Sequence, residues 1–187
     1  MQCEIKQYWD LNDDDVQAVY DHAVDEKLLD RVVYDAGLNR KMFPLFVRRA
    51  ECFCAVRSGG NPAGFFYLSH FEGATARLHL ALAAKPSADR DALVCRVLDW
   101  CFETFDFKSL LIITPADDQD ASKLWTSLGA DRLAEVPGLC WLEKKKKNVT
   151  GNLFLLHPNY IPPTTVGVCC RTVIPDKGSS TQNEIVR

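Results

Sequence analysis

The chain of 187 residues is 47% hydrophobic and 25% charged, a profile typical of one globular domain with an appendage. Its 22 basic and 25 acidic side chains give a formal net charge of −3, which excludes the global basic field that drives nonspecific nucleic-acid binding. The opening residues lack the cationic region and apolar core of a secretory signal, and no window approaches the ~20 apolar residues that span a bilayer. We therefore expect a soluble protein that is synthesised inside the cell.

The eight cysteines lie mostly in apolar runs, and no two C-x-x-C pairs occur among them. Metal sites built from cysteine need such paired spacing, so no metal site is expected. In a reducing compartment a thiol behaves as a small buried hydrophobe. We predict that role for these cysteines.

The N-terminal segment alternates short strand and helix signals. Cys3 to Tyr8 is a strand candidate. The Asn/Asp cluster at 12–15 precedes apolar residues at three-and-four spacing between Val16 and Val24, which predicts a capped helix. A second short helix is predicted from about Lys27 to Ala36, and "MFPLFV" at 42–47 is interpreted as an apolar linker.

The pattern then changes to the two-residue period of strands. Glu51 to Arg57, Gly64 to Phe71 and Thr75 to Leu82 are three strand-like runs, separated by the turn sequences "SGGNP" and "FEGA". Short turns between adjacent strands favour an antiparallel meander.

The second half of the domain alternates helix and strand. Ala88 to Phe105 carries one apolar stripe, and the buried-looking strand Ser109 to Thr114 follows it, which predicts a parallel crossover. A helix from Ala121 to Leu128 ends at Gly129, and Gly138 to Glu143 is predicted as the last core strand. The expected fold class is α/β (α+β), with a mixed central sheet flanked by helices in residues 1–143.

Residues 144–187 differ in composition from the rest of the chain. They begin with four lysines and are rich in Pro, Thr, Asn, Gly and Ser, with short apolar islands. We predict an extended C-terminal tail that lies along protein subunits of a larger assembly, with folding back onto its own domain as the alternative. The residues expected to bind a partner are Leu153, Phe154, Leu155, Tyr160, Ile161, Val166 and Val168.

The order of elements in residues 1–143 resembles the GNAT N-acetyltransferase fold. Its most specific part is "DDQDASKLWTSLGADRL" from Asp117 to Leu133, which is similar to the family's late helix with its Leu-Gly step at Leu128 and Gly129. Asp118 stands where the family has an Asn. Trp125 stands where the family has the Tyr that protonates the departing thiolate, so that acid is missing.

The resemblance also places the family's pyrophosphate loop, Q/R-x-x-G-x-G/A, in this chain. Lys85 takes the Q/R place, and Ala88 and Arg90 take the two Gly places. Glycine lets backbone amides and a helix N-terminus approach the phosphates of acetyl-CoA. Asp89 and Asp91 would complement the helix dipole themselves. We therefore expect no cofactor. The alternative is acetyl-CoA held by Lys85 and Arg90.

For an active member, the resemblance implies a general base on the central strands. His79 is the first candidate and Glu72, on the preceding turn, the second. Alternation in "RLHLAL" puts His79 on one face with Arg77 and Ala81, opposite three leucines, so a hydrogen-bonded structural histidine is the competing interpretation.

Two functions remain open from the sequence. The first is a non-catalytic GNAT-fold docking component of a larger assembly, with a phage virion as the assembly suggested by resemblance to short, divergent GNAT-like proteins of tailed bacteriophages. The second is an acetyl-CoA-dependent N-acyltransferase with a divergent pyrophosphate loop. The missing glycines and Trp125 favour the first.

Overall fold

A computed structural model describes residues 3–29, 38–83, 88–142 and 146–161. The strands are β1 (Cys3–Gln7), β2 (Cys52–Ser58), β3 (Asn61–Glu72), β4 (Thr75–Leu82), β5 (Ser109–Pro115), β6 (Asp131–Leu142) and β7 (Lys147–Leu156). The helices are η1 (Tyr8–Asp10), α1 (Asp13–Asp25), α3 (Phe43–Arg49), α4 (Ala88–Phe105) and α5 (Gln119–Ser127).

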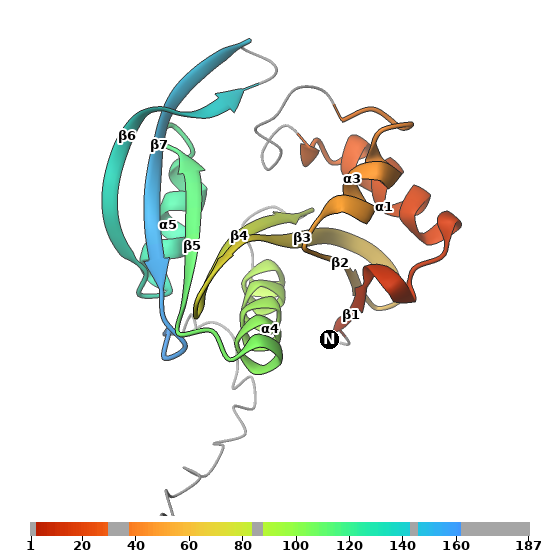
Figure 1. Ribbon diagram of the computed structural model, residues 1–187, viewed down its shortest axis with the longest axis horizontal. Helices are drawn as coiled ribbons and strands as arrows, with labels where there is room; N and C mark the ends of the chain where they lie inside the picture. Colours follow the sequence, from red (N-terminus) through yellow and green to blue (C-terminus); the bar gives the residue numbers. More distant parts are fainter. Residues whose placement is uncertain (1–2, 30–37, 84–87, 143–145, 162–187) are drawn as a thin grey trace, which may run out of the picture.

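One seven-stranded sheet organises the molecule, in the order β1-β2-β3-β4-β5-β7-β6. Every neighbouring pair is antiparallel except β4 and β5, which are parallel. Helices α1 and α3 cover one face of β2–β4, and α4 covers the other (Figure 1). Helix α5 shares the α4 core and packs beside β7. The predicted meander, the parallel crossover and the mixed sheet flanked by helices are confirmed.

Local capping explains where the helices begin. Helix α1 starts at a capping box, in which the Asn12 side chain accepts from the amide of Asp15 at 2.8 Å. Its apolar stripe is buried through Val16, Val19 and Ala23. The predicted limits of α4 are confirmed at both ends.

The segment "MFPLFV", interpreted as a linker, is instead part of helix α3. Pro44 lies in the first turn, where its missing N–H would have no partner in any case and its fixed φ suits a helix. Phe43 and Val47, four residues apart, are both fully buried against the sheet. The helix predicted from Lys27 to Ala36 lies largely outside the described residues.

The expected end of the domain at residue 143 is wrong, because β7 enters the sheet between β5 and β6. Asn152, Phe154 and Leu156 are buried at alternating positions, which is the period of a strand with one covered face. The polar composition of residues 144–152 hides this alternation. Strand β6 is also longer than predicted and is interrupted by a bulge between Val136 and Cys140.

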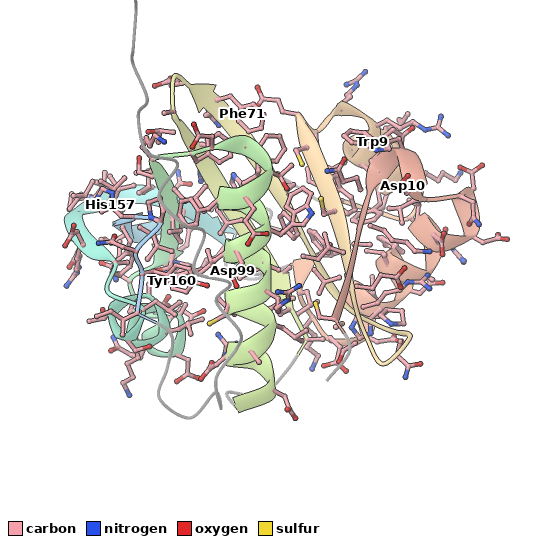
Figure 2. All side chains as sticks on the ribbon, turned by 90° about the horizontal axis from the view of Figure 1, so that it is seen from below. Trp9, Asp10, Phe71, Asp99, His157 and Tyr160 are labelled. Atoms are coloured by element: carbon pink, nitrogen blue, oxygen red, sulfur yellow. The ribbon has the colours of Figure 1, made fainter. Side chains whose placement is uncertain are left out.

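The segment that follows β7 packs on its own domain through residue 161. The Tyr160 hydroxyl donates to the Asp99 carboxylate at 2.7 Å and lies 3.0 Å from the Cys95 carbonyl, and Figure 2 shows Tyr160 beside Asp99 on α4. The Ile161 amide donates to the Leu128 carbonyl, although the Ile161 side chain is 63% exposed.

These contacts correct the expected partner surface. Phe154 and Tyr160 belong to the core of this chain and are 1% and 4% exposed. Leu153 and Leu155 are half-buried within β7. Folding back, the alternative for the tail, therefore holds as far as residue 161, and Val166 and Val168 lie outside the described residues.

The cysteines within the described ranges are free thiols, and all but the half-buried Cys3 are buried. Burial raises the pKa of the Cys101 thiol well above its ordinary value. The predicted role as small hydrophobes is confirmed for these residues. None of the helices in the described part of the chain has the length and apolar character needed to cross a bilayer.

We expect Gly64→Ala to destabilise the protein strongly. Gly64 pairs with Leu82 at φ +145°, and a Cβ at this position would lie 2.0 Å from the Ala81 carbonyl oxygen, so β3 and β4 would have to separate at a cost of about 3 kcal/mol. Urea denaturation would measure the change. Gly60→Ala is the control, because no atom lies within 4 Å and only its φ of +84° opposes the substitution, at a cost of about 1 kcal/mol.

Tyr160→Phe should lower the free energy of unfolding by about 2 kcal/mol, because it removes the hydrogen bond that the hydroxyl donates to the charged Asp99 carboxylate. The matched control is Tyr20→Phe. The Tyr20 ring packs on Phe43, and its hydroxyl has no hydrogen bond within the described part of the chain. Equal effects of the two substitutions on the thermal midpoint would contradict this role for the Tyr160 hydroxyl.

Candidate functional site

Strands β4 and β5 separate halfway along their length. Their pairing runs from Thr75 with Ser109 to Leu78 with Ile112. Beyond that pair β4 stays bonded to β3 as far as Leu82, while β5 stays bonded to β7 as far as Pro115. The two strands diverge visibly in Figure 1. The sheet therefore opens at its only parallel step within the described residues.

A narrow cavity of about 80 Å³ occupies this opening, and we call it the split cavity. That volume has room for roughly three water molecules, which suits the end of an extended chain rather than a whole nucleotide. The wall is formed by the second half of β4, the end of β5 and one side of α4 and α5. The lining residues used below are His79, Arg90, Thr114 and Trp125.

Thr114 is the unusual residue of the split cavity. It is 5% exposed, and its hydroxyl has no hydrogen-bond partner among the described residues. A buried hydroxyl without a partner costs about 1–3 kcal/mol. Sequence reasoning missed it, and the available signal was a polar residue closing the otherwise apolar strand "SLLIIT". A ligand in the opening could supply the missing partner.

His79 is the first residue of β4 after the last pair with β5. Its side chain is 9% exposed, and its ring stacks on Tyr67 with centroids 4.0 Å apart and an interplanar angle of 7°. The Ser69 hydroxyl lies 3.0 Å from Nε2 of His79 and 2.9 Å from Nδ1 of His70. The Ser69 hydroxyl therefore bridges the imidazoles of His79 and His70, and His70 is exposed at the surface.

A second, larger cavity of about 690 Å³ adjoins this histidine pair, and we call it the α3-side cavity. It lies between the end of α3, strands β3 and β4, and the β6–β7 pair. Residues that matter for its chemistry are Arg49, Glu51, His70, Arg77, His79 and Trp141. His79 lines both cavities, so this residue stands where they approach each other.

The structure separates the other predicted site residues. Arg90, in the first turn of α4, lines the split cavity, and Ala88 is the first residue of that helix. Lys85 lies outside the described residues. Glu72 pairs with Thr75 at the opposite end of β4 and lines neither cavity. At about 3.3 Å per residue, Thr75 lies roughly 13 Å from His79, so the structure does not bring Glu72 together with His79.

Helix α5 supplies the remaining wall. Asp118 caps the helix by accepting from the Ala121 amide at 3.0 Å, as expected for the position where the resemblance has Asn. Trp125, which stands where the resemblance has the acidic Tyr, is 4% exposed and lines the split cavity. The indole N–H donates hydrogen bonds, but it is a far weaker acid than the hydroxyl of a phenol. Trp125 therefore cannot serve as the acid here. Within the described ranges, no three His, Cys, Asp or Glu side chains gather as metal ligands.

No family model matches this sequence, and no curated protein is significantly similar to it. Comparison of structures does find similar proteins. A spermidine N-acetyltransferase from Vibrio cholerae, solved with CoA and spermine, is 11% identical with a TM-score of 0.69, covering 84% of this chain and 96% of that chain.

Two further solved structures agree. An N-acetyltransferase from Staphylococcus aureus is 10% identical with a TM-score of 0.67, covering 84% of this chain and 99% of that one. A ribosomal-protein-S18-alanine N-acetyltransferase from Escherichia coli is 17% identical with a TM-score of 0.59, covering 83% and 94%. At these identities the likeness concerns the fold. The protein therefore has the fold of the GNAT N-acetyltransferases, as the order of its elements predicts.

Proposed function

We propose that the protein is an acetyl-CoA-dependent N-acyltransferase, the second of the two functions left open by the sequence. The supporting observation is the position of His79, which lines the split cavity on one side and the α3-side cavity on the other. A thioester entering the first cavity and an amine entering the second would meet at this imidazole. Acyl transfer needs such a meeting of donor, acceptor and base.

The split cavity fits the thioester end of an acyl-CoA in shape and in polarity. Beyond Leu78 and Ile112 the described residues of β4 and β5 are not paired with each other, so an extended chain could lie between the two strand edges as a strand does. The hydroxyl of Thr114 lacks a partner there. Arg90 stands at the helix end of the cavity, where its guanidinium could bind a phosphate in place of the missing glycines.

Acyl-CoA, when bound, supplies an activated acyl group, and the protein handles the protons. His79 would accept the proton of the attacking amine, and Ser69 could relay a proton to the exposed His70 because its hydroxyl lies within 3.0 Å of both rings. Stacking on Tyr67 holds the His79 ring in place. Thr114 would donate a hydrogen bond to the departing sulfur, a contact that Trp125 at the tyrosine position cannot supply as an acid.

The second candidate is the non-catalytic docking component. It is favoured by Trp125, by the absence of glycine from the predicted loop and by two carboxylates, Asp89 and Asp91, in the first turn of α4. Large apolar side chains such as Trp9, which is 69% exposed at the outer edge of the molecule in Figure 2, could contact another subunit. A setting in a phage virion rests on the sequence resemblance alone.

Calorimetric titration with acetyl-CoA separates these two functions. We expect binding in the micromolar range, weakened at least tenfold by Arg90→Glu because the reversed charge repels the phosphates. The matched control is Arg96→Glu on the same helix, which is exposed and lines neither cavity. His79→Gln should keep the binding and abolish acyl transfer. No heat of binding at millimolar acetyl-CoA would favour the docking component.

Thr114→Val should separate activity from stability. Removal of a buried hydroxyl that has no partner leaves the protein as stable as before, or more stable by about 1 kcal/mol. We expect kcat to fall at least tenfold while KM for acetyl-CoA changes little, because the hydroxyl would act mainly on the departing sulfur. Steady-state kinetics and thermal melting measure the two effects. Thr126→Val, which removes an exposed hydroxyl bonded to the Ser122 carbonyl, is the control.

A further inference from the structure

Two arginines of the α3-side cavity have no carboxylate partner among the described residues. Arg77 is half-buried on β4, and Arg49 is exposed at the last position of α3. Other arginines of this half of the molecule are paired, Arg57 with Asp15 and Arg48 with Asp13. A half-buried guanidinium is costly to leave without an anion. The cavity therefore has a cationic wall with no anion of the described chain paired to it.

The position of Arg77 ties this charge to the proposed reaction. Arg77 and His79 are two residues apart and share a face of β4, and at about 3.3 Å per residue their Cα atoms lie roughly 7 Å apart. Burial raises the pKa of the Cys140 thiol to about 11, and the positive charge of Arg77 acts on that thiol in the opposite direction. Arg77 lines the α3-side cavity together with Leu139 and Trp141 of β6.

The other titratable residues that line the cavity do not neutralise the positive charge of Arg49 and Arg77. Glu51 contributes one carboxylate and is exposed beside the end of α3. His70 and His79 can each carry an additional positive charge and no negative one. Trp141 and Tyr67 add flat apolar surface to the same cavity. The lining therefore offers two fixed cations against one fixed anion.

We propose that the acceptor bound in the α3-side cavity is an amine carrying an anionic group a few bonds from its nitrogen. Arg77 holds that anion by paired N–H donors, a geometry that suits a carboxylate or a phosphate. The spacing of Arg77 and His79 then directs the amine toward the imidazole, and Arg49 adds positive charge at the rim. This inference rests on the proposed acyl transfer and adds the substrate class to it.

Four amines of similar length test the inference in an acetyl-transfer assay: β-alanine, phosphoethanolamine, propylamine and 1,3-diaminopropane. We expect kcat/KM for at least one anionic amine to exceed that for neutral propylamine tenfold or more, with the diamine lowest. The higher of the two anionic rates identifies carboxylate or phosphate as the recognised group. Equal rates for all four amines would overturn the inference and leave acyl transfer standing.

Variants assign the preference to the cavity. Arg77→Gln should reduce the ratio of kcat/KM for the preferred anionic amine to kcat/KM for propylamine at least tenfold. Arg49→Gln, a surface change that does not threaten folding, should reduce this ratio by about threefold. Arg48→Gln, on the same helix but outside the cavity lining, is the matched control. A preference that survives both cavity substitutions would contradict the assignment.

A binding measurement keeps the two proposals distinguishable. β-Alanine and phosphoethanolamine are titrated into His79→Gln without acyl-CoA, so that no transfer is required. Binding that Arg77→Gln weakens supports the anion site even if the wild-type protein transfers no acetyl group, in which case the proposed function fails alone. Absence of binding to both the wild-type protein and His79→Gln would overturn the anion site.

Discussion

The separation of β4 from β5 is the constraint on which the rest of the molecule depends. Each strand is held along its outer edge by an antiparallel ladder, β4 by β3 and β5 by β7, while the shared edge pairs only from Thr75 and Ser109 to Leu78 and Ile112. Closing the opening would require one outer ladder to shift as a whole, because the residues of a sheet move together with their hydrogen bonds. The split cavity is therefore a property of the fold and does not depend on which side chains line it.

This opening gives a single position on β4 an unusual environment. Each residue of β4 from Thr75 to Leu78 has β5 as its neighbour on one edge of the strand. His79, the next residue, is past the last pair with β5 and lines both the split cavity and the α3-side cavity. The period of two then places Arg77 on the same face of the strand. Ser69, which pairs with Arg77 across β3 and β4, brings its hydroxyl to the imidazole. Register alone thus assembles the polar part of the site.

Sequence patterns predict those parts of the fold that local periodicity determines. The meander, the limits of α4 and the parallel crossover follow from spacing and turns. The α3 helix was missed because a proline in an apolar run indicates a break, although its place in the first turn allows a helix. Strand β7 was missed because buried Asn152 makes the segment look polar. Its amide is satisfied by Ser122 and Arg132, which are distant in sequence.

For the site too, local sequence patterns predict some residues, while others depend on packing between residues that are distant in sequence. His79 could be found from its strand and its face. Thr114 is informative only because its buried hydroxyl has no hydrogen-bond partner among the described residues, and this can be seen only in the three-dimensional structure. A domain that served only as a scaffold would be more stable with an apolar group at position 114 and with a carboxylate beside Arg77. The other unpartnered buried atom among the described residues, His22 Nε2, lies apart on α1. Thr114 and Arg77 flank His79 from opposite cavities, so the unmet polar groups lie where bound substrates would satisfy them.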